Sequence, residues 1–134
     1  MLTKRIIFDG RHTEETARNH ADLYLKLKRD RDFGRIKIPQ FDVNIHKNVV
    51  TLNIEFIKGF QWTTHDFRKH ALLIRDNLVY KEGKYTFTDY SPHNFLYDFT
   101  TNDIYYVDLE SYRFCPIEER ELLLKEKKSE IGFL

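Results

Sequence analysis

One stretch, Phe87 to Glu110 (FTDYSPHNFLYDFTTNDIYYVDLE), constrains the fold of this chain more than any other. Two short apolar runs within it, 95–97 and 103–107, are separated by a polar segment rich in Thr, Asp and Asn. Apolar runs of this length on either side of a turn-forming segment are typical of a β-hairpin. The residues that enter and leave such a hairpin meet at its open end.

Three polar side chains flank the predicted hairpin: Asp89 and Asn94 precede it, and Asp108 follows it. Asn94 and Asp108 would meet at the open end and could share a cation, with Asp89 nearby as a separate carboxylate. Oxygen ligands for Mg²⁺ beside a carboxylate base are what phosphoryl transfer requires. The same residues also fit a hairpin whose Asp and Asn side chains are only solvated turn formers. Spacing alone leaves both interpretations open.

Length and composition predict one folded domain. The 134 residues are 41% hydrophobic and 15% aromatic, which favours a packed interior over disorder. A formal net charge of +1 gives no general attraction to nucleic acid or to an anionic membrane. No apolar run reaches the roughly 18 residues of a membrane span. The N-terminal residues do not resemble a signal peptide, so we expect a soluble cytoplasmic protein.

A strand followed by a helix is predicted at the N-terminus. The alternation of residues 2–8 indicates a strand that places Leu2 and Lys4 on one face. A helical period over residues 13–29, capped by the threonine at its first position, puts Glu14 at the start of an apolar face. That face consists of Ala17, Ala21, Tyr24 and Leu25.

A hairpin and two further helices are predicted next. The runs 40–45 and 49–57 lie on either side of a His-Lys-Asn turn, as in an antiparallel hairpin. Residues 64–79 show a helical period, preceded by a threonine cap. The last helix is expected over 117–128, before an apolar end, 131–134, that could dock on the body or on a partner. The stripe of the middle helix consists of Phe67, Ala71, Ile74 and Leu78.

Several common active-site motifs are absent from the sequence. It contains no GxxxxGK[ST], GxGxxG or GxSxG motif. His65 and His70 are five residues apart, which does not place two zinc ligands on one helix face. Cys115 is the only cysteine, so no intrachain disulfide can form, and we expect it to be a small buried residue rather than a nucleophile.

Three other short motifs come after Lys4 and Glu14 in the sequence. They are Glu55–Gly59 (EFIKG), Thr88–Asn94 (TDYSPHN) and Val107–Glu110 (VDLE). In this order they resemble the linker, the catalytic loop and the metal-binding aspartate of the protein-kinase-like superfamily. The resemblance is closest to the branch of aminoglycoside phosphotransferases and lipopolysaccharide-core kinases, and it runs from Leu2 to Tyr112.

The resemblance implies an α+β fold, namely a minimal protein-kinase-like domain that spans residues 1–134. Residues 1–58 would correspond to an N-lobe made of a small antiparallel sheet and a helix. Residues 59–134 would correspond to a reduced helical C-lobe that carries the catalytic β-hairpin. Such a core would be completed by a homodimer partner or by another chain.

The resemblance also implies a small kinase that uses ATP and Mg²⁺ and transfers the γ-phosphoryl group to a hydroxyl-bearing acceptor. Asp89 would accept or orient the proton of that hydroxyl group. Asn94 and Asp108 would hold Mg²⁺ on the phosphates of the nucleotide. Lys4 would contact the same phosphates and pair with Glu14.

The adenine ring would be held by residues from other parts of the chain. The backbone of Glu55 and Ile57 would form hydrogen bonds with its edge, while Leu2 and Leu96 would cover its two faces. The sequence departs from the family at two points. The glycine-rich loop has no counterpart before the lysine, and Phe87 stands where a histidine is usual.

Two alternatives to an active kinase stay open. The first is a nucleotide-binding pseudokinase that acts through a partner without turnover. The second is a plain α+β interaction domain. No nucleic-acid partner is expected, because the basic residues are not interleaved with aromatic residues on one stripe.

Overall fold

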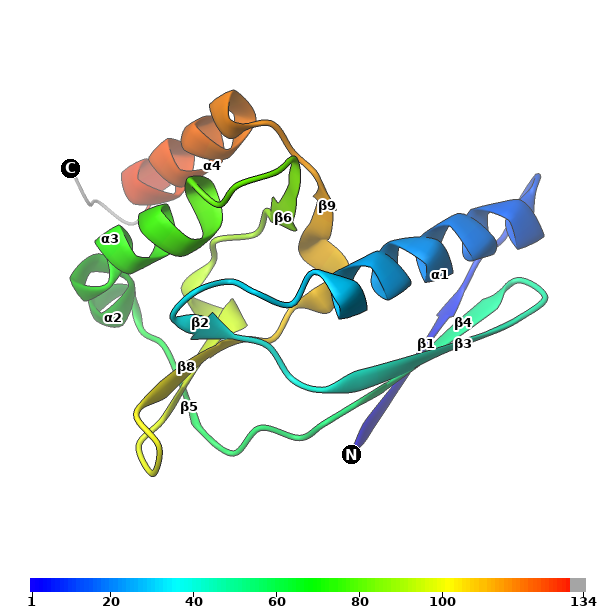
Figure 1. Cartoon of the computed structure of the whole chain (residues 1–134), viewed down its shortest axis with the longest axis horizontal. Coiled ribbons are helices and arrows are strands. Elements are labelled where there is room, and N and C mark those ends of the chain that lie inside the picture. Colours follow the sequence, from blue (N-terminus) through cyan, green and yellow to red (C-terminus); the bar gives the residue numbers. More distant parts are fainter. Residues whose placement is uncertain (131–134) are drawn as a thin grey trace. The chain divides into compact units, whose positions relative to one another are not determined.

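The computed structural model describes residues 1–130, which fall into two compact units (Figure 1). Unit 1 comprises Met1–Arg31 and Pro39–Phe56, and unit 2 comprises Asp32–Ile38 and the chain from Ile57 onward. Each unit combines helix with sheet, so the predicted α+β class is confirmed. The apolar end 131–134, for which docking is predicted, lies outside the described residues.

Unit 1 contains a three-stranded antiparallel sheet with the order β1-β4-β3. Its strands are β1 (Leu2–Ile7), β3 (Phe41–His46) and β4 (Val49–Ile54). The β3–β4 hairpin confirms the prediction from sequence, with Val43 opposite Leu52 and the turn residue Lys47 at a positive φ of 54°. Leu52 and Val50 are fully buried, as expected for the inward face of a central strand.

Helix α1 (Thr13–Arg29) has the predicted bounds and packs on β3 and β4. Leu25, predicted to face the core, is 45% exposed, because the buried stripe continues from Tyr24 by three residues to Leu27. The predicted threonine cap is also wrong. His12 is the N-cap, in a left-handed conformation and without a side-chain hydrogen bond to the helix. The buried stripe consists of Ala17, Ala21, Tyr24 and Leu27.

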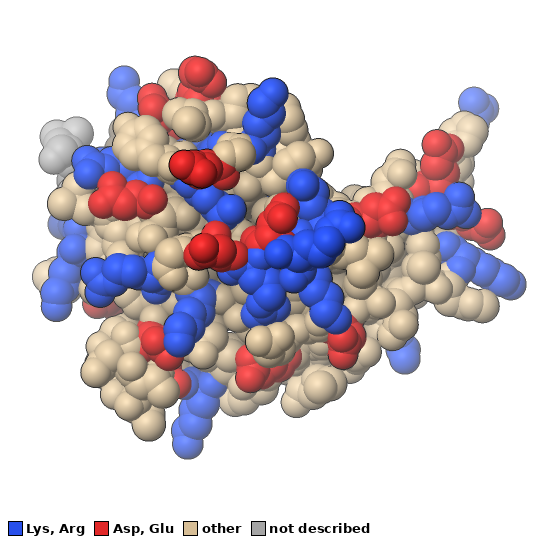
Figure 2. Space-filling model, in the orientation of Figure 1, with Lys and Arg blue, Asp and Glu red and all other residues tan. Residues whose placement is uncertain are grey.

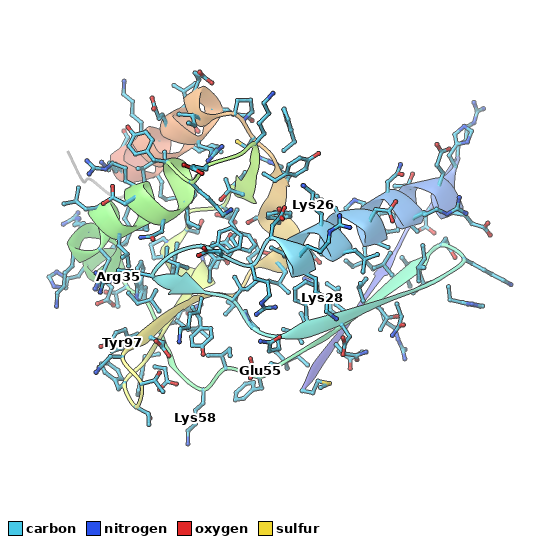
Figure 3. The ribbon with its side chains drawn as sticks, in the orientation of Figure 1. Lys26, Lys28, Arg35, Glu55, Lys58 and Tyr97 are labelled. Carbon is cyan, nitrogen blue, oxygen red and sulfur yellow. The ribbon has the colours of Figure 1, made fainter. Side chains whose placement is uncertain are left out.

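Basic side chains gather over the C-terminal end of α1, where Lys26 and Lys28 are labelled (Figures 2 and 3). Both are paired within unit 1. The Lys28 ammonium lies 2.7 Å from a carboxylate oxygen of Asp42, and Lys26 lies 3.2 Å from Asp30. Cations at this end also interact favourably with the helix dipole. These residues are therefore accounted for by local contacts.

The sheets of unit 2 are small. A four-stranded sheet has the order β2-β8-β7-β5, and a separate two-stranded ribbon joins β6 to β9. The β7–β8 hairpin confirms the central prediction from sequence, with Phe95 opposite Tyr106 and Asp98 opposite Asp103. The strands are β2 (Ile36–Lys37), β5 (Phe60–Gln61), β6 (Tyr85–Phe87), β7 (Phe95–Asp98), β8 (Asp103–Tyr106) and β9 (Tyr112–Phe114).

The predicted single helix over 64–79 is divided into three pieces. They are α2 (Thr64–Lys69), α3 (Ala71–Ile74) and a π-helical turn, η1 (Arg75–Val79). The predicted threonine cap is Thr63 rather than Thr64, and Thr63 forms a reciprocal capping box with Asp66. The last helix is α4 (Ile117–Glu130). Across residues 1–130, no helix has both the length and the apolar character needed to cross a membrane.

Aromatic side chains form the core of unit 2. Phe87 stacks on Tyr106 with 4.2 Å between ring centroids, and it also packs against Phe33 at 4.8 Å and Tyr112 at 5.7 Å. Phe95 meets Tyr106 edge to face at 5.2 Å. These five rings are at most 1% exposed. Phe87 is thus a core residue of unit 2.

Arg120 on α4 is fully buried although it is charged. Its Nε donates to the carbonyl oxygen of Cys115 at 2.6 Å. Its two terminal nitrogens donate to the carbonyl oxygens of Leu78, Val79, Lys81 and Gly83. Multiple hydrogen bonds of this kind compensate for the loss of water around a buried charge. Arg120 therefore ties α4 to the end of η1 and to the turn before β6.

Candidate functional site

The loop that carries Asp89 is anchored at its start. Strand β6 ends at Phe87, and the next residue, Thr88, is buried. The Thr88 hydroxyl group donates to the carbonyl oxygen of Ser111 at 2.8 Å, and its backbone N–H donates to the same oxygen at 3.2 Å. Ser111 belongs to η3 (Leu109–Ser111), the 3-10 turn that follows Asp108. The segments before Asp89 and after Asp108 are therefore held side by side.

Asp89 is partly buried and its carboxylate is fixed by Ser91. One carboxylate oxygen, Oδ1, accepts hydrogen bonds from the Ser91 hydroxyl group at 2.7 Å and the Ser91 backbone N–H at 3.1 Å. Burial alone would raise the pKa of Asp89. The hydrogen bonds from Ser91, with smaller effects of Asn94 and His93, hold that pKa below its usual value. Asp89 is therefore ionised at neutral pH.

Asn94 ends the 3-10 turn η2 (Pro92–Asn94) and is only 7% exposed. Its carbonyl oxygen accepts from the Val107 backbone N–H at 3.0 Å, which extends the β7–β8 ladder by one bond beyond the strands. Its side-chain amide nitrogen donates to the backbone carbonyl of Asp89 at 3.4 Å. The amide oxygen, on the other arm of the amide, is the atom suited to bind a cation.

Asp108 directly follows Val107 at the open end of the hairpin and is partly buried. Its backbone carbonyl accepts from the Ser111 N–H at 3.2 Å, which closes the η3 turn. Asn94 pairs with Val107 across the hairpin base, so Asp108 lies one residue past the partner of Asn94.

Asp89 and Asp108 line one cavity of about 370 Å³. Glu110 and Arg113 also line it, and the side that α4 contributes was not predicted from sequence. The residues from α4 are Leu123, Glu126, Lys127 and Glu130. Asn94 lies at the hairpin base and is not among the lining residues. The cavity therefore brings together two of the three predicted polar groups.

Tyr106 is a residue of the site that sequence reasoning missed. It is fully buried, and its hydroxyl group donates to the carbonyl oxygen of Asp89 at 2.9 Å and lies 2.5 Å from the Ser111 hydroxyl oxygen. Burial and the charges of Asp108 and Asp89 raise its pKa far above the usual value, against the effect of the Ser111 hydrogen bond. The signal in the sequence is a tyrosine at an inward strand position, since a buried hydroxyl group needs a partner.

The hairpin base offers few ligands for a metal ion. Among residues 1–130, no group of three or more His, Cys, Asp and Glu side chains is placed to hold a metal ion. Asn94 and Asp108 supply an amide oxygen and a carboxylate. Mg²⁺ is commonly held by one or two such protein ligands, with water and substrate phosphates completing the octahedron. Two oxygen donors alone are too few for an all-protein cage.

The remaining predicted residues of unit 1 are exposed. Leu2 is 54% exposed, and Lys4 lies on the same face of β1, opposite Leu52 of β4. Glu14, predicted to start the buried face of α1, is exposed instead, because that face begins with the fully buried Ala17. Glu55 is also exposed, and its Oε1 accepts from the backbone N–H of Gln40 at 3.1 Å (Figure 3).

Two predicted adenine contacts belong to unit 2. Ile57 is half-buried and is the first residue of the second segment of unit 2. Leu96 is half-buried on β7, opposite Tyr105 on one side and Gln61 on the other. Nearby, Gly59 passes so close to β7 that an added Cβ atom would lie 2.8 Å from the carbonyl oxygen of Tyr97.

No family model, curated protein or solved structure matches this chain.

Proposed function

We propose that this protein is a small phosphotransferase that moves the γ-phosphoryl group of ATP, in the presence of Mg²⁺, to a hydroxyl acceptor. The observation that carries the proposal is the shared cavity of Asp89 and Asp108, with Asn94 held at the same hairpin base by the Val107 N–H. The order of these residues along the chain is also that of the kinase-like catalytic loop and metal-binding motif.

Asp89 is suited to act on the acceptor. Its carboxylate is ionised at neutral pH and is oriented through Oδ1 by Ser91. An ionised carboxylate held in place in this way can orient a hydroxyl group and take its proton as the phosphorus–oxygen bond forms.

Asn94 and Asp108 would hold Mg²⁺ together with the phosphates of the nucleotide. The metal would supply neutralisation of phosphate charge in the transition state. The chain's contribution is to hold the two oxygen donors at fixed positions, through the β7–β8 ladder on one side and the η3 turn on the other. Roles for Lys4, Glu14 and the adenine contacts stay predictions from the resemblance.

The test uses purified protein and radiolabelled ATP with Mg²⁺, and measures both transfer to a panel of hydroxyl compounds and hydrolysis with water as the acceptor. Loss of a positioned base typically lowers a rate by about a hundredfold or more, so we expect Asp89→Asn to do so. Asp98→Asn, at the tip of the same hairpin, is the matched control and should retain the wild-type rate. If wild type and Asp89→Asn transfer phosphate at the same background rate, the proposal is wrong.

A nucleotide-binding module without turnover is the second candidate. The observation that favours it is Phe87, a fully buried core residue where kinase-like catalytic loops usually carry a histidine. A ligand that binds only the folded state raises the melting temperature. A rise with Mg²⁺-ATP that is lost in Asp108→Asn, combined with no measurable turnover, would select this function. No rise at millimolar Mg²⁺-ATP would instead indicate that the Asp and Asn residues only form turns.

A further inference from the structure

Four aromatic side chains share one face of the β5–β7 pairing in unit 2. Phe60 lies directly opposite Tyr97, and the Trp62 backbone N–H donates to the carbonyl oxygen of Phe95 at 3.0 Å. Cross-strand partners project from the same face of a sheet, and so do residues two apart on one strand. The four rings therefore stand on one side of the strand pair. Phe99, just past the end of β7, adds a fifth ring.

The exposure of these rings is uneven. Trp62 is buried and stacks on Phe95 at 4.5 Å and on His70 at 4.9 Å. Phe60 and Phe99 are 67% and 65% exposed, although they meet edge to face at 5.1 Å. Adjacent exposed aromatic rings leave apolar surface in water, and contiguous apolar surface of this kind marks binding sites. In Figure 2, uncharged side chains also gather over the β7–β8 hairpin.

A cavity of about 200 Å³ opens among these rings. Pockets for drug-sized ligands begin at roughly 300 Å³, so this one suits a smaller molecule with a single ring. Its lining residues are Phe60, Gln61, Trp62, Asp66, Lys69, His70, Tyr97 and Phe99, of which Tyr97 is labelled in Figure 3.

The polar groups of the cavity leave one cation without a partner. Lys69, in the last turn of α2, forms no hydrogen bond or ion pair with the residues of the described range. Asp66 also lines the cavity, but its carboxylate is engaged by the Thr63 backbone N–H at 2.9 Å and the Thr63 hydroxyl group at 3.0 Å. An anionic group in the cavity would therefore find an available ammonium.

His70 adds a hydrogen-bond acceptor. Its Nδ1 lies 3.0 Å from the carbonyl oxygen of Asp66. A carbonyl oxygen only accepts, so Nδ1 carries the proton of the neutral ring and Nε2 is left with a lone pair. The cavity thus offers aromatic walls, one cation and one acceptor.

We propose that this cavity binds a small ligand that consists of one aromatic ring with an anionic group. The ring would pack on Phe60, Tyr97 and Phe99, and its anionic group would contact Lys69. The site is separate from the cavity of Asp89 and Asp108, with which it shares no lining residue.

The single tryptophan of the chain provides the readout, because Trp62 lines the cavity. Benzoate is titrated into the intact protein while tryptophan fluorescence is excited selectively. A ligand of this size is expected to bind with a Kd on the order of 1 mM. Benzamide, which lacks the charge, and cyclohexanecarboxylate, which lacks the aromatic ring, should both bind more weakly. Absence of any saturable change with benzoate would overturn the site, and equal binding of cyclohexanecarboxylate would overturn the role of the ring.

Variants separate the two parts of the recognition. Lys69→Gln should weaken benzoate by about two- to fivefold, as for an exposed ion pair, and leave benzamide unchanged. Lys125→Gln makes the same charge change on α4, outside the cavity, and should bind benzoate like wild type. Phe99→Ser should weaken both ligands. Unchanged benzoate affinity in Lys69→Gln would overturn the ionic contact. The assay needs neither ATP nor Mg²⁺, so its outcome is independent of the proposed phosphotransferase activity.

Discussion

The hydroxyl group of Tyr106 donates a 2.9 Å hydrogen bond to the backbone carbonyl of Asp89. The same hydroxyl oxygen lies 2.5 Å from the side-chain oxygen of Ser111. One fully buried side chain on β8 therefore fixes the backbone of the loop that presents Asp89 and the turn that follows Asp108. The position of both carboxylates depends on this contact as well as on the β7–β8 hairpin.

Tyr106→Phe should destabilise the protein by about 1–3 kcal/mol, because it removes two hydrogen bonds, to the Asp89 carbonyl and to the Ser111 hydroxyl group, which are shorter than the bonds that Asn94 and Thr88 still make to these groups. The ring, and so the packing on Phe87, is kept. Urea unfolding followed by circular dichroism measures the change. Tyr80→Phe, at a side chain that is 49% exposed, should stay within about 0.5 kcal/mol of wild type and serves as the control. A Tyr106→Phe protein as stable as this control would contradict the prediction.

Ser91→Ala should destabilise the protein by about 1 kcal/mol at pH 7, where Asp89 is ionised. Because Ser91 lowers the pKa of Asp89, its contribution is complete above the unfolded-state value and is lost as pH falls through the folded-state value. The stability difference between wild type and variant should therefore shrink below about pH 4. Urea unfolding at several pH values measures it. A difference that stays constant with pH, or one that also appears in the exposed control Ser129→Ala, would argue against this coupling.

Arg120→Met should destabilise the protein by about 3 kcal/mol or more, because the five carbonyl oxygens that it binds would lose a buried donor. Arg120→Lys keeps the charge but has fewer donors in a different geometry, so its stability should lie between that of wild type and that of Arg120→Met. The free energy of unfolding is compared with that of Arg18→Met, an exposed arginine on α1. If both methionine variants lose the same stability, the carbonyl contacts contribute little.

Gly59→Ala should destabilise the protein by about 1–3 kcal/mol, because the new Cβ atom would lie 2.8 Å from the backbone oxygen of Tyr97 and no side chain can move aside. The exposed neighbour Lys58 supplies the control Lys58→Ala. Near-ultraviolet circular dichroism should change together with stability, since Trp62 follows the affected β5 strand. A wild-type spectrum and stability in Gly59→Ala would show that β5 can move away from β7 at no cost.

The parts of the fold that could be predicted are those with a strong local signal. The bounds of α1, the β3–β4 hairpin and the β7–β8 hairpin each follow from periodicity between turn residues. The register of the second hairpin also places Asn94 opposite Val107, next to Asp108. These predictions depend on residues close together in sequence.

The errors have physical reasons. The apolar stripe from Phe67 to Leu78 continues through the break at His70 and the π-helical turn, so periodicity could not reveal either feature. Within that turn, Asn77 accepts from the Arg35 backbone N–H at 3.0 Å and donates to the Leu73 carbonyl at 2.8 Å. Such a distant tie is not encoded in local spacing.

The remaining parts depend on contacts between distant segments. The parallel pairing of Ile36 with Ile104 involves a strand of only two residues, which is too short to carry a pattern. The contribution of α4 to the cavity of Asp89 and Asp108 was missed for a different reason, because the charged residues of that helix were interpreted as solvated.

Every acceptor of Arg120 belongs to the backbone, and this has a consequence for how the sequence can vary. The side chains at positions 78, 79, 81, 83 and 115 take no part in the contact, so this contact does not restrict which residues stand there. The contact depends on the side chain of one residue, Arg120. Among relatives of this chain we therefore expect a constant arginine that covaries with no other position, unlike a buried ion pair, whose two members change together.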